Sequence, residues 1–254
     1  TGPNPRSVAI LPQEPFSGEG GEIVQAERGG RVVVWDTPPR DALTLAAPRW
    51  AKHIEPPHAG GDYSLSSPSV GDVDGDGEPE IVLTDHSEDG GAGTVFVLDG
   101  APGDTLYAVE AQESDASWVF LGEDPGVPAR RPALGCLDND SDDLEIVVSG
   151  ATLFTGGVEA DTYELHLLEV DGASLSELAT CTASALLPYR SGDPDTPAAG
   201  TEEPVVADLD GDGHFEILMA TVHGDIAAWA YDDGEEECTV PGGWPVHLGD
   251  VAYA

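Results

Sequence analysis

Apolar positions in this chain come in short runs of four to eight residues, separated by polar stretches rich in Gly, Pro, Asp and Ser. Runs of that length with turn-forming residues at their ends are typical of β-strands. Three stretches align on one another, at residues 67–85, 131–150 and 203–221. A weaker copy, assembled from residues 7–11 and 20–27, precedes them and has no acidic loop between its two apolar runs. The pattern therefore indicates a repeat protein.

A Glu-Ile pair anchors the four copies at intervals of about 60 to 70 residues, at Glu22, Glu80, Glu145 and Glu216. Each copy continues through a Gly-containing turn into a third apolar run, at residues 31–36, 94–100, 163–172 and 225–234. A fourth element, beginning with Trp, is expected at residues 50–54, 118–122 and 244–249. Four strands per repeat predict an all-β protein, a single β-propeller region over residues 1–254 with four-stranded blades at approximately 1–58, 59–125, 126–195 and 196–254.

Charge excludes two classes of partner. The 254 residues carry 49 Asp and Glu against 9 Lys and Arg, a formal net charge of -40. Nucleic acids and anionic membrane surfaces attract basic patches, and this chain has a single lysine, Lys52. Nor does it contain an apolar run of about 18 residues, so we expect no membrane insertion.

Two acidic loops, at residues 72–80 and 208–216, place carboxylates at their positions 1, 3, 5 and 9. Several carboxylates that converge in a tight turn repel one another unless a hard cation binds between them, and Ca²⁺ tolerates a looser oxygen geometry than Mg²⁺. The predicted ligands are the side chains of Asp72, Asp74, Asp76 and Glu80 with the carbonyl of Glu78, and the side chains of Asp208, Asp210, Asp212 and Glu216 with the carbonyl of His214. The loops are not EF-hands, because position 12 is Leu83 in one and Met219 in the other, where a bidentate Glu is required.

The middle copy carries a degenerate version of this loop. Cys136 stands where the first Asp is expected, and one residue is inserted before Glu145. A third Ca²⁺ site in a shifted register would use Asp138, Asp140 and Asp142 together with Glu145.

These loops and their flanking strands resemble FG-GAP or VCBS repeats, the blades of integrin-alpha-type β-propellers, as does the Gly-Gly-Trp-Pro-Val stretch at 242–246. The resemblance implies Ca²⁺ in the loop between the first two strands of a blade and a secreted or cell-surface protein. Propellers of this family usually have seven blades, which would need well over about 400 residues. We therefore expect the four blades to be part of a larger, for example seven-bladed, propeller; completion by another chain is the second alternative and a closed four-bladed ring the third.

No catalytic motif is found, since the sequence contains no GxSxG, P-loop, HExxH or CxxC pattern, and we predict no enzyme. Three functions fit: a Ca²⁺-stabilised extracellular module for adhesion, ligand binding or assembly; a carbohydrate-binding or ancillary domain of a secreted hydrolase or lyase; and a self-assembling structural surface protein. The expected partner is a protein or glycan ligand, or further copies of this chain.

Cys181 and Cys238 each follow the third apolar run of their units. They are therefore expected to meet across adjacent blades and form a disulfide in an oxidising compartment. That pairing leaves Cys136 as a buried thiol beside the middle acidic loop.

Overall fold

A computed structural model describes most of the repeat units, over residues 5–11, 22–27, 29–36, 48–54, 63–87, 94–100, 105–110, 118–120, 130–138, 143–152, 162–171, 174–182, 203–220 and 225–247. All regular elements in these ranges are strands, and they form four antiparallel sheets. The all-β prediction is confirmed. No helix in the described part of the chain has the length and hydropathy of a membrane span.

Each sheet is built from one stretch of sequence. The first has the order β1 (Pro5–Leu11), β2 (Glu22–Glu27), β3 (Arg31–Asp36), β4 (Pro48–His53). The second has the order β5 (Tyr63–Leu65), β7 (Glu80–Ser87), β8 (Thr94–Asp99), β9 (Thr105–Glu110), with β6 (Ser69–Gly71) also on β7. The third has the order β10 (Trp118–Phe120), β12 (Glu145–Thr152), β13 (Thr162–Asp171), β14 (Ser174–Thr182), with β11 (Ala133–Gly135) also on β12. The fourth has the order β15 (Val205–Ala207), β16 (Glu216–Ala220), β17 (Asp225–Asp232), β18 (Glu237–Thr239), with β19 (Val246–His247) also on β17.

The role predicted for the Trp at 118 is wrong. Trp118–Phe120 pairs with Gly150–Thr152 of β12, so it belongs to the third sheet and not to the end of the second. The fourth strand of the second sheet is β9 instead. The physical reason is that the first strand is split: β10 and β11 pair with the two halves of β12, as β5 and β6 do with β7. The third sheet therefore begins at Trp118, before residue 126 where the third unit was predicted to start.

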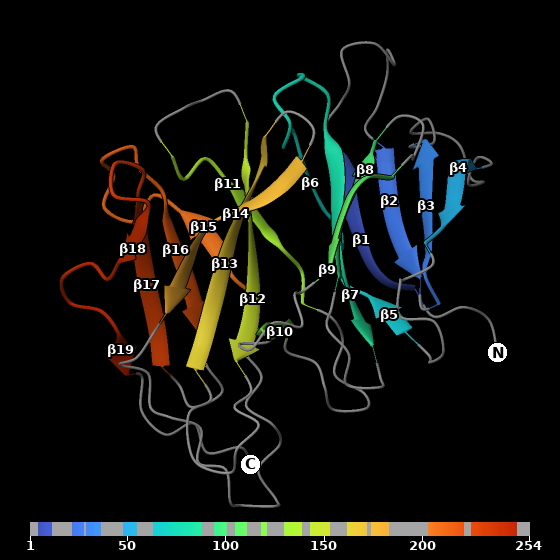
Figure 1. The fold of residues 1–254 in the computed structure, drawn as a ribbon. Helices are drawn as coiled ribbons and strands as arrows, with labels where there is room; N and C mark the ends of the chain where they lie inside the picture. Colours follow the sequence, from blue (N-terminus) through green and yellow to red (C-terminus); the bar gives the residue numbers. More distant parts are fainter. Residues whose placement is uncertain are drawn as a thin grey trace, which may run out of the picture.

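The four sheets stand side by side in chain order, with the fourth and first sheets at opposite ends of the row (Figure 1). Strands of neighbouring sheets contact each other at β1 and β6, at β6 and β11, and at β14 and β18. The core lies in the three junctions between sheets. One cluster joins the first and second sheets, a second joins the second and third, and the third joins the third and fourth.

Strands in the middle of the row bury both faces, which explains their continuous apolar runs. On β7, Ile81 and Leu83 pack toward the first sheet, whereas Val82 between them packs toward the third. On β12, Ile146 packs back toward the second sheet and Val147 toward the fourth. The Ile of the Glu-Ile pair thus faces the preceding sheet in these units.

Strand β11 contacts both β6 and β15 across the sheets, and the close approach of these strands requires glycine at two places. A Cβ atom on Gly71 of β6 would lie 2.7 Å from Leu144 Cδ1, and one on Gly135 of β11 would lie 2.3 Å from Val206 Cγ1. Leu144 directly precedes β12 of the third sheet, and Val206 lies in β15 of the fourth, so each contacted side chain comes from the following unit. Glycine therefore lets neighbouring sheets pack closely at their inner edges.

Candidate metal centres

The loop between β6 and β7 is held by its own first carboxylate. Asp72 Oδ1 accepts a hydrogen bond from the backbone N–H of Gly75 (2.9 Å), and Oδ2 accepts one from Gly77 (2.9 Å). Asp74 and Asp76 each accept from the backbone two residues further on, at 3.3 and 2.8 Å. Gly75 and Gly77 have φ angles of 72° and 90°, which disfavour any residue with a side chain. The turn thus brings successive carboxylates to one side.

Glu80 closes this loop from the first residue of β7. Its Oε2 accepts a hydrogen bond from the backbone N–H of Val73 (3.0 Å), and its side chain is buried. Burial and, to a smaller extent, the charges of Asp74, Asp76 and Asp72 together raise the pKa of Glu80 to about 8, against the opposing effect of the Val73 hydrogen bond. Burial and the neighbouring carboxylates also raise the pKa of Asp74. The carboxylates of this loop therefore repel one another, and a bound cation would relieve that repulsion.

The loop between β15 and β16 repeats these contacts. Asp208 accepts from the backbone N–H of Gly211 (2.7 Å) and of Gly213 (3.2 Å), Asp210 from Asp212 (3.2 Å), and Asp212 from His214 (2.9 Å). Glu216 accepts from the backbone N–H of Leu209 (2.8 Å), as Glu80 does from Val73. The same nine-residue pattern therefore folds the same way in two units of the chain.

The two loops differ in which carboxylates converge. In the second sheet, oxygens of Asp72, Asp74 and Glu80 lie within 4.8 Å of one another. In the fourth sheet, the oxygens that meet this limit belong to Asp208, Asp210 and Asp212, all exposed. Asp76, Glu78, His214 and Glu216 stand in the same loops but are not members of these groups.

The middle loop is described only in part, because Asp140 and Asp142 lie outside the described residues. Leu137 donates its backbone N–H to the buried carboxylate of Glu145, which keeps the contact found in the other two loops. Burial raises the pKa of Glu145 to about 7. Among the described residues of this loop, Asp138 and Glu145 form no group of three potential ligands.

One acidic neighbour of the first loop escaped the sequence analysis. Asp99, the last residue of β8, pairs in register with Glu80, and its charge contributes to the raised pKa of Asp74. Its signal is weak, because an Asp before the Gly of a turn is common. In the fourth sheet Ala230 pairs with Glu216, so this additional carboxylate has no counterpart there.

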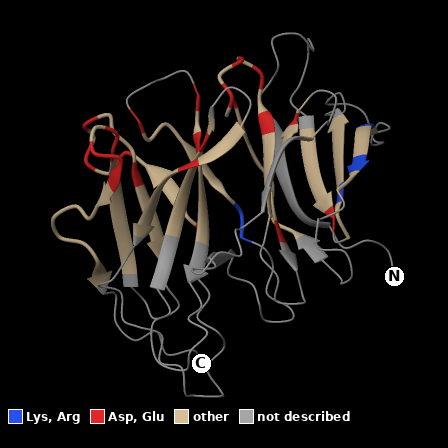
Figure 2. Ribbon diagram, in the orientation of Figure 1, with Lys and Arg blue, Asp and Glu red and all other residues tan. Residues whose placement is uncertain are grey.

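Acidic residues gather at one end of the described sheets, where the loops before β7, β12 and β16 and the β17–β18 turn lie together (Figure 2). The turn contributes Asp232, Asp233, Glu235, Glu236 and Glu237. Both candidate metal loops therefore open on the same end of the molecule.

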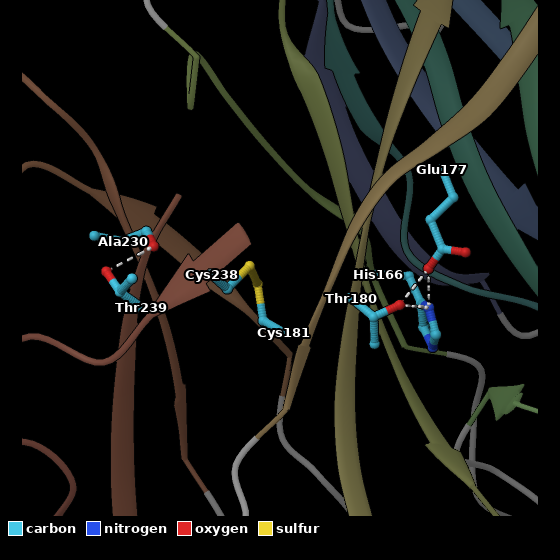
Figure 3. Close-up of a disulfide and its surroundings, with 7 residues drawn as sticks. All are labelled: His166, Glu177, Thr180, Cys181, Ala230, Cys238 and Thr239. Atoms are coloured by element: carbon cyan, nitrogen blue, oxygen red, sulfur yellow. Dashed lines mark hydrogen bonds and ion pairs between the residues drawn. A yellow bond between two sulfur atoms is a disulfide. The ribbon is translucent and has the colours of Figure 1, made fainter. Parts of the chain in front are cut away.

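Cys181 of β14 and Cys238 of β18 form a disulfide, with Cα atoms 5.1 Å apart (Figure 3). The bond links the third and fourth sheets beside their shared core. Cys136 lies outside this bond and is half-buried rather than buried; its thiol contacts the carbonyl of Asp138 (3.6 Å).

A second polar cluster lies on the third sheet, on β13 and β14 (Figure 3). The Nδ1 atom of buried His166 lies 2.7 Å from Glu177 Oε1, and the hydroxyl of Thr180 donates to the same oxygen (2.6 Å). The hydrogen bonds of His166 and Thr180 lower the pKa of Glu177. The cluster joins two strands of one sheet, which indicates a structural role.

Comparison with known proteins identifies an FG-GAP repeat at residues 64–98, which span β6, the first acidic loop, β7 and most of β8. The FG-GAP identification is confirmed for this segment. No curated protein matches the chain.

Similar solved structures include Bacillus licheniformis rhamnogalacturonan lyase PL11, at 13% identity and a TM-score of 0.49, over 93% of this chain and 51% of that one. The rhamnogalacturonan lyase YesW gives 13% and 0.47, over 98% and 53%, and the exotype lyase YesX gives 14% and 0.46, over 95% and 50%. This chain thus spans about half the length of each of these lyases.

Proposed function

We propose that this chain is a noncatalytic, calcium-binding β-propeller module of a secreted or cell-surface protein that binds a protein or glycan ligand. The observation that carries the proposal is the repeated loop: Asp72 and Asp208 make the same pair of hydrogen bonds to the third and fifth following residues in two separate sheets. The same backbone conformation, with the same carboxylates and glycines, recurs in the two loops, which supports a common function for them. Calcium binding is the purpose that the ligand chemistry supports best.

The charge balance of the first loop supports a divalent cation. Three carboxylate oxygens converge within 4.8 Å, one of them on Glu80, whose side chain is only 3% exposed. Lys and Arg are scarce in the whole chain, so cationic side chains offer little compensation. A hard cation with six to eight oxygen ligands would also use the carbonyl groups of the loop and water.

The arrangement of the sheets supports the propeller. Four sheets of four or five strands follow one another in chain order, and each packs a face against the next. The glycines at the inner edges allow the convergence that blades need near an axis.

Placement outside the reducing cytoplasm is favoured by the disulfide between Cys181 and Cys238, since such bonds persist in oxidising compartments. Calcium at about millimolar concentration would occupy sites of the affinity found in extracellular modules. The proposed protein or glycan ligand would bind at the surface of this module, a role in keeping with the FG-GAP repeat of residues 64–98.

Calorimetric titration with Ca²⁺ tests the proposal. We expect two ions per chain for the wild type, one each for Asp72→Asn and Asp208→Asn, and none for the double variant. Asp233→Asn, an exposed acid of the β17–β18 turn, is the matched control and should leave both sites intact. A third ion would place binding in the middle loop as well. Stoichiometry that does not respond to Asp72→Asn or Asp208→Asn would refute the assignment.

A further inference from the structure

The second residue of each acidic loop reports whether another sheet covers that loop. Val73 in the second sheet is 0% exposed and Leu137 in the third is 5% exposed, because each enters the core shared with the next sheet. Leu209 holds the same position in the fourth sheet and is 43% exposed. Nothing in the loop itself distinguishes the three residues, since each donates its backbone N–H to the Glu that ends the loop.

Besides Leu209, other apolar side chains of the fourth sheet are exposed or point away from the core. Val205 of β15 is 52% exposed and pairs in register with Leu218 of β16, which points away from the core formed by its neighbours Ile217 and Met219. Val246 of β19 is 38% exposed and pairs with Ile226 of β17. We call the surface of Val205, Leu209, Leu218 and Val246 the outer face of the fourth sheet.

The complementary surface is at the other end of the row. On the first sheet, Val24 and Val34 pack against the second sheet, so Ile23 and Trp35, which pair with each other, face the opposite way and are half-buried. In the second, third and fourth sheets the residue equivalent to Ile23 is the Ile that contacts the preceding sheet. We call the surface of Ile23 and Trp35 the outer row of the first sheet.

We propose that a second copy of this chain packs the outer row of its first sheet against the outer face of the fourth sheet. The proposed contact has the same arrangement as the three junctions within the chain. In each of those, one sheet packs against the face of the next sheet that carries the Ile of the Glu-Ile pair. On the fourth sheet, Val205 and Leu209 expose apolar area that the contact would remove from water. On the first sheet, Ile23 and Trp35 are half-buried and lie beside polar Gln25 on the same face. Two copies related by a two-fold axis form this junction twice and make a closed dimer.

The contact differs from the internal junctions at its inner edge. Ala207 stands where Gly71 and Gly135 admit a side chain of the following sheet, because all three residues pair with the Glu of the Glu-Ile pair. The methyl group of Ala207 keeps the inner strand of the second copy farther away. Metal binding in the acidic loops is not required for this contact.

Sedimentation velocity from micromolar to hundreds of micromolar chain tests the proposal, at physiological ionic strength because chains with a net charge of -40 repel one another at low salt. We expect a dimer for the wild type and at least about a tenfold weaker dimer for Leu209→Asp. Phe215→Asp is the matched control: Phe215 is 38% exposed, but it occupies the place of Leu144, which packs back toward the preceding sheet.

Mixing two variants tests the head-to-tail direction. Leu209→Asp keeps an intact first sheet and Ile23→Asp keeps an intact fourth sheet, so the two proteins together can form one junction that neither forms alone. We expect more dimer in the mixture than in either separate sample at the same total concentration, with circular dichroism showing that both variants are folded. A wild type that stays monomeric across the concentration range, a dimer that Leu209→Asp does not weaken, or folded variants that do not complement each other would overturn the proposal.

Discussion

The backbone N–H of Leu144 donates a hydrogen bond to the carbonyl oxygen of Asp72 over 3.0 Å. Leu144 precedes β12 of the third sheet, whereas Asp72 is the first residue of the acidic loop in the second sheet. The side chain of Leu144 also lies against Gly71, the residue before Asp72. The loop proposed to bind calcium is therefore part of the junction between two sheets, and its conformation affects both.

Calcium should stabilise this junction. Extracellular sites with dissociation constants of about 10⁻⁴ to 10⁻³ M contribute about 0.4 to 1.4 kcal/mol each at millimolar Ca²⁺. We expect slower hydrogen exchange at the amide of Leu144 when calcium is added, and a thermal midpoint a few degrees higher than with chelator. Asp72→Asn should abolish the effect of calcium on Leu144, whereas Asp208→Asn should preserve it. Equal exchange with calcium and with chelator would contradict the link.

Glu80 should make the metal-free protein sensitive to pH. Its pKa is about 8 in the folded chain and near 4.5 when unfolded, so the folded state retains a proton that the unfolded state has lost. The stabilisation from protonated Glu80 is complete below about pH 4.5 and is lost as the pH rises through about 8. Since one unit of pKa difference corresponds to about 1.4 kcal/mol, the effect is on the order of a few kcal/mol.

Urea denaturation with chelator checks this behaviour in Glu80→Gln. The variant should match the wild type below about pH 4.5 and exceed its free energy of unfolding at about pH 8, because a neutral amide has no charge to desolvate. Glu78→Gln, in the same loop but exposed, is the control and should follow the wild type. Parallel pH curves for Glu80→Gln and the wild type would show that Glu80 ionises normally.

Reduction of the disulfide should destabilise the chain. Cys181 and Cys238 are separated by 57 positions, and closing a loop of this size in the unfolded chain contributes about 3 to 4 kcal/mol. We expect Cys181→Ser to lower the denaturation midpoint in guanidinium by an amount that reductant reproduces in the wild type. Cys136→Ser should leave the response to reductant unchanged. Thiol titration of the denatured, unreduced chain should find one reactive thiol, and finding three would contradict the bond.

The acidic loops were predictable because their structure is local. Asp72 bonds to residues three and five positions later, so the motif itself contains every contact that shapes the turn. The strand at Trp118 was assigned to the wrong sheet because a three-residue strand has no periodicity and its partner, β12, lies beyond a long intervening segment. Asp99 was missed for a related reason: only the β7–β8 register brings it beside Glu80.

Exposure in the fourth sheet also could not be read from the sequence. Val73 and Leu209 occupy the same position in nearly identical motifs, yet one is buried and the other is 43% exposed. The difference arises from the neighbouring sheet, which is a property of the assembly and not of the motif. Periodicity therefore predicts which side chains can be buried, whereas the fold determines which of them are.

The last expectation concerns the glycine that lets the third and fourth sheets approach. A Cβ atom on Gly135 would lie 2.3 Å from Val206 Cγ1 and 3.0 Å from Val206 Cβ, so Gly135→Ala forces the inner strands apart and should cost about 1 to 3 kcal/mol of the free energy of unfolding. Val206→Ala removes the closer of these atoms. The double variant should lose less free energy of unfolding than the sum of the losses of the two single variants, because the clash depends on Val206.

Gly242→Ala is the matched control, since a Cβ atom there meets nothing within 4 Å. Chemical denaturation of the four proteins gives the coupling between positions 135 and 206 directly. A strictly additive double variant, or a Gly135→Ala chain as stable as Gly242→Ala, would show that the sheets are not packed at van der Waals contact along this edge. Strong coupling would instead establish that β11 and β15 meet edge to edge, as adjacent inner strands of a propeller must.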